Sequence, residues 1–147
     1  MLVVFFVAIS VACVYAEGME SHDFGKFKMD IPVAPNGEIE ETQGGTGNHP
    51  IYAIPNPDST LFAYADYFDT SYVNGTKNVT DFVLNKVKEN YTVDVVNGTP
   101  TWVYDGDENS YASNMGYLVS SDDDTQVVLI QGRDIHIQDA VNSIEFK

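Results

Sequence analysis

Cysteine and basic residues are scarce in this chain. Its 147 residues include one cysteine, Cys13, which lies inside an apolar amino-terminal segment. The rest of the chain has no thiol, which excludes a disulfide scaffold and a cysteine-ligated metal site there. Seven lysine and arginine residues stand against 22 aspartate and glutamate residues, for a net charge of −15. Because such a charge repels phosphate groups, we expect no nucleic-acid partner and no attraction to anionic membranes.

A long apolar run occurs only at the amino terminus. Residues 1–16 (MLVVFFVAISVACVYA) carry no charged side chain, yet they are shorter than the roughly 20 residues that a membrane-spanning helix needs. The run is typical of an export signal, and Val14-Tyr15-Ala16 has the small residues of a cleavage site. We therefore predict a signal peptide over residues 1–16 and a single domain over residues 17–147. That domain is expected to be secreted or extracytoplasmic, either free or associated with the cell surface, and to be monomeric and without a membrane helix.

Two alternatives stay open for the amino-terminal segment. Val11-Ala12-Cys13 resembles the end of a lipoprotein signal, in which the cysteine is acylated and anchors the protein to a membrane. Ser10 departs from that motif, which usually has leucine at this position. The other alternative is that residues 1–16 form a buried strand or helix of the folded domain.

Most of the domain is predicted to form strands. Residues 27–31 alternate apolar and polar side chains, which is typical of a half-buried strand. Residues 127–130 are apolar at every position, which predicts a central strand buried on both faces. The Asn-Gly pair at 97–98 and the polar residues 121–124 separate apolar runs and predict two hairpin turns. The expected strands cover residues 27–31, 39–42, 51–54, 61–68, 93–96, 101–104, 111–120 and 125–132.

Two helices are predicted from apolar side chains at helical spacing. The first covers residues 79–91, with Asn78 as its amino-terminal cap. The second covers residues 137–146. Residues 17–23 are polar and are expected to form a loose lead-in. The order of elements predicts an α+β fold, in which an antiparallel β-sheet is flanked by two main helices.

Two segments carry a resemblance to a known family. Residues 24–32 (FGKFKMDIP) and residues 139–147 (DAVNSIEFK), with the middle helix and the two hairpins between them, resemble the PsbP-like family. More narrowly, they resemble its small secreted relatives in methanogenic archaea. The resemblance covers about residues 23–147 and implies an α/β/α sandwich. It also implies a non-catalytic role, since the best-known member is an accessory subunit of photosystem II, although no functional residue carries over.

Four N-x-Thr sequons lie within a short stretch of the chain, and each is a candidate site for N-linked glycosylation in an exported protein. The same asparagines are also suited to turns and helix caps, and the two interpretations are compatible. The candidate asparagines are Asn74, Asn78, Asn90 and Asn97.

An acidic segment resembles the start of a calcium loop. Asp105, Asp107 and Asn109 place oxygen ligands at alternate positions. Ser110 and Gly116 stand where the full loop needs glycine and a bidentate glutamate, so these residues are weak metal candidates only. The acidic residues 122–124 are candidate neighbours of such a site.

No catalytic motif is present. The histidines at positions 22, 49 and 136 lack metal-ligand spacing, and no G-x-S-x-G motif occurs. We therefore predict a non-enzymatic binding or accessory domain without a cofactor, whose partner is an extracellular protein or a carbohydrate. Two alternatives are a secreted hydrolase that uses a carboxylate and a histidine, and a weakly calcium-dependent adhesion module.

Overall fold

The computed structural model describes residues 18–33, 37–104, 114–133 and 136–147. The predicted signal peptide over residues 1–16 lies outside the described residues. So do the three metal candidates Asp105, Asp107 and Asn109.

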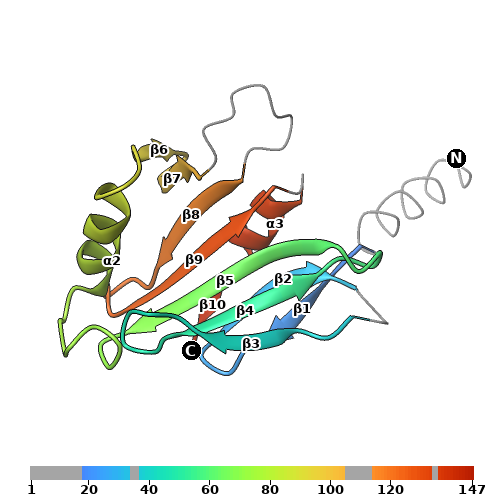
Figure 1. The fold of residues 1–147 in the computed structure, drawn as a ribbon, viewed down its shortest axis with the longest axis horizontal. Coiled ribbons are helices and arrows are strands. Elements are labelled where there is room, and N and C mark those ends of the chain that lie inside the picture. The colour runs from blue at the N-terminus through green and yellow to red at the C-terminus, as the bar shows by residue number, and fades with distance from the viewer. Residues whose placement is uncertain (1–17, 34–36, 105–113, 134–135) are drawn as a thin grey trace, which may run out of the picture.

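The described residues form two antiparallel sheets and two helices (Figure 1). The small sheet has the strand order β1-β2-β10, and the large sheet has the order β3-β4-β5-β9-β8-β7-β6. The elements are β1 (Met19–Asp23), β2 (Phe27–Pro32), β3 (Glu40–Gln43), β4 (Pro50–Pro55), β5 (Leu61–Asp69), α2 (Val79–Lys88), β6 (Asp94–Val96), β7 (Thr99–Val103), β8 (Met115–Ser120), β9 (Gln126–Gly132), α3 (Ile137–Asn142) and β10 (Glu145–Phe146).

The predicted fold class was wrong. The domain is mostly β, with sheets of three and seven strands, and is not a helix-flanked α+β sandwich. The prediction placed only helices against the large sheet. In the structure the three-stranded sheet packs against one of its faces, together with α3. A strand that pairs with a distant segment has the same local pattern as one that extends a single sheet, so the sequence did not separate the two arrangements.

The main core lies between the two sheets and is closed by α3. Alternate residues of a strand point to opposite faces, so Val128 and Ile130 of β9 face this core, while Val127 faces the other side. We call this set the intersheet core. Its buried members are Phe27, Met29, Ile31, Ile54, Phe62, Ala63, Ala65, Tyr67, Tyr117, Val128, Ile130, Ile137, Ala140 and Val141.

Helix α2 covers part of the opposite face of the large sheet. Val79, Val83 and Val87 are buried against β9 and its neighbours. The predicted cap is confirmed, because the Asn78 side chain accepts a hydrogen bond from the Asp81 N–H at 2.9 Å. The helix ends at Lys88, three residues before the predicted end, in a turn in which the N–H of Tyr91 bonds back to the carbonyl of Val87.

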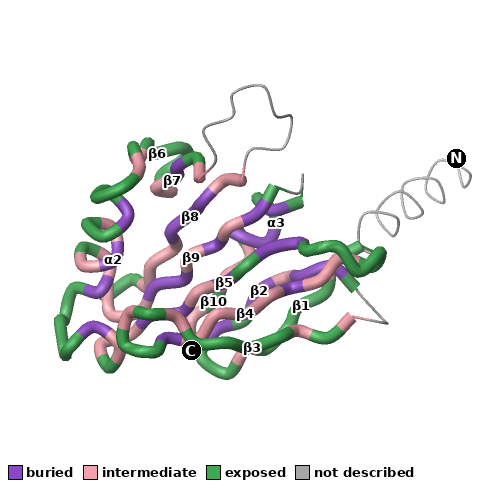
Figure 2. Tube along the Cα trace, viewed as in Figure 1, coloured by how far each residue is buried: buried purple, intermediate pink, exposed green. Residues whose placement is uncertain are grey.

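Strand β9 is the middle strand of the large sheet, as the apolar run predicted. It lies between β5 and β8, and Figure 2 shows buried positions along all three strands. The two predicted hairpin turns are confirmed as well. At the first turn Asn97 has φ 50° and Gly98 has φ 80°, which are the left-handed conformations that an Asn-Gly hairpin uses.

Both ends of the described chain differ from the prediction. The expected loose lead-in at residues 17–23 contains β1, which pairs along its length with β2. The expected closing helix at 137–146 stops at Asn142, and residues 145–146 form β10 on the other edge of β2. Ser143 fixes this change of direction, because its hydroxyl donates to the Ala140 carbonyl and accepts the Asp30 N–H at 2.7 Å.

Candidate ligand-binding cleft

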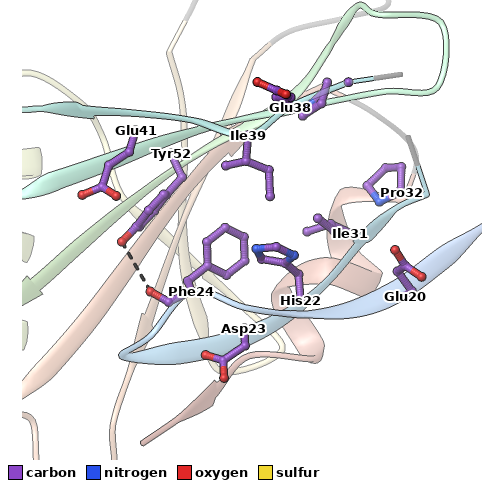
Figure 3. Close-up of a pocket in the computed structure, with 12 residues that line it drawn as sticks. Glu20, His22, Asp23, Phe24, Ile31, Pro32, Glu38, Ile39, Glu41 and Tyr52 are labelled. Carbon is purple, nitrogen blue, oxygen red and sulfur yellow. Dashed lines mark hydrogen bonds between the residues drawn. The ribbon is translucent and has the colours of Figure 1, made fainter. Parts of the chain in front are cut away.

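A cleft of about 520 Å³ opens between the small sheet and the β3–β4 side of the large sheet (Figure 3). Its size lies within the range of about 300–1,000 Å³ that is usual for small-molecule sites. Aromatic and aliphatic side chains and four carboxylates line it. The lining residues are Glu20, His22, Asp23, Phe24, Ile31, Pro32, Gly37, Glu38, Ile39, Glu41, Tyr52 and Pro55.

The cleft exists because β1 carries polar residues on its inward face. Glu20 is paired with Ile31, and His22 is paired with Met29. Directly paired residues share a face of the sheet, so Glu20 and His22 point toward the same side as two core residues. Both are nevertheless exposed. The space between the two sheets is therefore open to solvent along β1.

The facing side of the cleft follows the same rule. Glu41 of β3 is paired with Tyr52 of β4, and Tyr52 packs against the intersheet core. Glu41 thus stands at an inward-facing position of an edge strand. Each sheet therefore carries one carboxylate on the inward face of its edge strand, Glu20 on β1 and Glu41 on β3, and both line the cleft.

Aromatic rings form the inner part of the cleft. Phe24 lies at its centre, with ring centroids 4.7 Å from His22 and 5.0 Å from Tyr52 (Figure 3). Phe24 also stacks on Phe27, whose side chain is fully buried in the intersheet core. This continuous packing links the cleft to the intersheet core. The aromatic surface is thereby held in place before any ligand arrives.

The electrostatics of the cleft favour positive charge. Burial, and then the negative charge of Glu41, raise the pKa of Tyr52, so its phenol stays protonated and donates a long hydrogen bond of 3.5 Å to the Phe24 carbonyl. A hydrogen bond from the Lys147 ammonium and another from the Gly25 N–H lower the pKa of Asp23. Asp23 is therefore ionised at neutral pH, and the Lys147 ammonium balances its negative charge. Among the described residues the cleft lining includes no lysine or arginine.

A second cluster of polar residues lies on the opposite face of the large sheet. The His49 ring is 5% exposed and stacks on Phe68 with centroids 4.0 Å apart. Its Nε2 lies 2.9 Å from Asp66 Oδ2, and its Nδ1 lies 2.9 Å from the Thr46 carbonyl oxygen. Both ring nitrogens thus face acceptors, and neither is available to a substrate. The pair fastens the 44–49 turn to β5, in a space where a side chain at Gly44 would overlap the ring.

The four predicted glycosylation sites are all exposed asparagines. They lie on either side of α2 and in the turn of the β6–β7 hairpin, and none of them lines the cleft. The β6–β7 hairpin is at the opposite end of the large sheet from β3 and β4 (Figure 1). Asn78 differs from the others, because its side chain is bound to Asp81 on both its oxygen and its nitrogen.

In the acidic turn at residues 122–124, two of the three carboxylates already accept hydrogen bonds from nearby hydroxyls. Asp123 accepts the hydroxyls of Ser121 and Thr125, which lowers its pKa, and Asp124 accepts the hydroxyl of Thr80 at 2.7 Å. Within the described ranges no group of three or more histidine, cysteine, aspartate or glutamate residues could hold a metal ion. Nor does any helix in those ranges have the length and apolarity to cross a membrane.

The cleft is not predicted from the sequence. There His22 is one of three scattered histidines, Phe24 contributes only to the family resemblance, and Glu20, Asp23 and Tyr52 belong to no functional motif. The polar residues of β1, next to the apolar residues of β2, are typical of an edge strand that borders a solvent-filled space. This pattern is informative only once residues 19–23 are known to form a strand.

Comparison of the chain with known protein families and with curated proteins finds no match. The resemblance to the PsbP-like family therefore stays a prediction.

Proposed function

We propose that this protein is an exported, non-enzymatic binding domain and that the cleft between its two sheets holds a small organic cation. The cleft itself is the observation that carries the proposal. It combines an aromatic surface, formed by Phe24 and Tyr52, with four carboxylates in its lining, of which, in the described part of the chain, only Asp23 is bound to a lysine.

Charge and shape select this class of ligand. Carboxylates gathered around one opening repel each other, and a bound cation relieves that repulsion. An aromatic face also attracts cations through its quadrupole, by about 0.5–2 kcal/mol depending on solvent exposure. A ligand with a protonated amine and an apolar body would satisfy both features, with its body against Phe24 and its charge near Glu41 or Glu38.

Binding is favoured over hydrolysis by the positions of the histidines. His49 and Asp66 are close enough to cooperate, but the His49 ring is buried and both of its nitrogens are engaged. His22 lines the cleft, yet among the described residues it makes no hydrogen bond to a carboxylate. A carboxylate–histidine mechanism needs such a pair within reach of the substrate.

The ligand class is tested with three probes of similar shape and different charge. Phenethylamine, phenethyl alcohol and phenylacetate are titrated into the protein, and binding is followed by NMR at the His22 and Tyr52 rings. We expect phenethylamine to bind about tenfold more tightly than the alcohol, and phenylacetate not to bind. A lysine-containing peptide, titrated in parallel, distinguishes a free amine from a protein side chain as the source of the cation.

Three variants localise the effect. Glu41→Gln should weaken phenethylamine binding several-fold and leave phenethyl alcohol unchanged, since only a charge is removed. Ile39→Trp should fill the cleft and reduce binding of both probes. Glu89→Gln removes the same charge at an exposed position near the end of α2 and should change neither. Equal affinity for all three probes would contradict a preference for cationic ligands. Binding that is unchanged in Ile39→Trp would show that the ligand binds outside the cleft.

Export is tested separately by mass spectrometry of the protein from the extracellular fraction of its natural source. We expect a chain that begins at Glu17, because residues 1–16 are removed at the membrane. Acylation of Cys13 would give a longer chain with added lipid mass. An intact amino terminus on protein found inside the cell would contradict the proposed location.

A further inference from the structure

Strand β6 leaves an apolar edge on the large sheet. In the described part of the chain it pairs with β7 alone, and Val95 and Val96 are 69% and 52% exposed. Val103 of β7, which lies beyond the residues that pair with β6, is 46% exposed. Free strand edges with apolar side chains recruit other strands, and proteins usually block them with lysine, proline or a covering segment. No lysine or arginine occurs between residues 89 and 104.

Two of the four sequons bracket this edge. Asn90 lies before β6, and Asn97 lies in the turn directly after it. Both asparagines are exposed, and neither side-chain amide makes a hydrogen bond within the described residues. Asn78 is the contrasting case, since its amide is bound to Asp81 and the hydroxyl of its sequon threonine, Thr80, is bound to Ser120 and Asp124.

A hollow beside Asn90 is suited to a sugar ring. It has a volume of about 460 Å³, and Asn90 is part of its lining together with Tyr91, Trp102 and Tyr104. The Tyr91 and Tyr104 rings lie 4.9 Å apart, and the Trp102 and Tyr104 rings lie 5.8 Å apart. Aromatic faces can pack against the C–H groups of a pyranose, and the half-buried rings of Tyr91 and Tyr104 are the accessible ones here, since Trp102 is 2% exposed. The exposed Thr92 hydroxyl and Asp94 carboxylate offer polar partners at the margin.

We propose that N-linked glycans on Asn90 and Asn97 cover the β6 edge and keep the large sheet from pairing with a second molecule. The modification forms a bond between the asparagine Nδ2 and the anomeric carbon of an oligosaccharide carried on a lipid phosphate. The bond from that carbon to the phosphate oxygen breaks, the lipid phosphate leaves, and the amide nitrogen loses one proton. A hydrated oligosaccharide at each end of a three-residue strand occupies the space that an incoming strand would need.

The test compares sequon variants of the exported protein made in a host that glycosylates N-x-Thr sites. Glycopeptide mass spectrometry is expected to find sugar on Asn90 and Asn97 and none on Asn78. The double variant Asn90→Asp/Asn97→Asp should associate at least about tenfold more tightly than the glycosylated protein in analytical ultracentrifugation. Asn74→Asp is the matched control, because Asn74 has φ 56° in an Asn-Gly turn like that of Asn97 but lies at the other end of α2.

A further substitution tests whether the association of the double variant occurs through the β6 edge. Adding Val95→Lys to the double variant places a charge on the bare edge and should restore the monomer. Unmodified Asn90 and Asn97 would overturn the proposal. So would a double variant that stays as monomeric as the Asn74→Asp control, or one whose association Val95→Lys leaves unchanged.

Discussion

Replacing Phe27 with alanine is expected to lower the free energy of unfolding by about 3–5 kcal/mol, which is the usual cost of deleting a buried phenylalanine. Phe27 is fully buried and connects the small sheet to the large one. Its ring stacks on Tyr67 of β5 with centroids 5.9 Å apart and on Phe24 at 4.7 Å. Removing it leaves a cavity between the two layers that neither sheet can close without losing its register.

Urea unfolding followed by circular dichroism measures this loss. A domain of ordinary stability has about 5–15 kcal/mol in total, so the variant should unfold at a much lower urea concentration. Leu61→Ala is the control, since Leu61 lies on β5 but is 46% exposed, and it should change stability by less than about 1 kcal/mol. Equal effects of the two substitutions would show that the small sheet does not pack against the large one as described.

The stability of the protein should fall as the pH rises above about 6.5, the ordinary pKa of histidine. Burial of the His49 ring lowers its pKa, but the hydrogen bonds to Asp66 and to the Thr46 carbonyl outweigh this, so the pKa of His49 in the folded protein is raised. A raised pKa in the folded state means that the stabilisation is complete below the unfolded pKa. It is then lost as the pH rises through the folded value.

Asp66→Asn isolates this contribution. At pH 6 the substitution should cost about 2 kcal/mol, somewhat less than for a fully buried ion pair because the Asp66 side chain is 26% exposed. The difference between the variant and the natural protein should shrink as the pH rises through the raised pKa of His49 in the folded protein, because the ring then loses its charge. The measurement is thermal or urea unfolding at several pH values.

The pair His136–Asp139 provides the comparison. Its side chains are 55% and 70% exposed, so Asp139→Asn should have little effect at any of these pH values. A constant difference between natural protein and Asp66→Asn across the pH range would contradict a charged His49.

The sequence predicted correctly the elements that are marked by a local signal, such as a helix cap, a turn pair or an apolar run. The Asn78 cap fixed the start of α2, the Asn-Gly pair at 97–98 fixed a hairpin, and the apolar run at 127–130 identified the central strand. In each case the signal comes from neighbouring residues. The physical preference of a cap, a turn or a doubly buried strand is therefore readable without the rest of the molecule.

The elements that the sequence did not reveal depend on distant partners. Strand β1 is polar on its inward face because it borders a cleft, so the alternation that identifies most half-buried strands is missing. Strand β10 has two residues and exists only because β2 offers it an edge. The candidate site follows from β1, whose residues Glu20, His22 and Asp23 line the cleft.

The small sheet also determines when the chain can reach its final structure. Strand β2, near the beginning of the domain, pairs with β10 near its end, and Asp30 is hydrogen-bonded to Ser143 across 113 positions of sequence. Contacts between such distant segments form slowly, because the intervening chain must be ordered first. A ribosome that still holds residues 137–146 therefore holds a domain whose main core lacks the side formed by α3, so folding can be completed only after these residues are released.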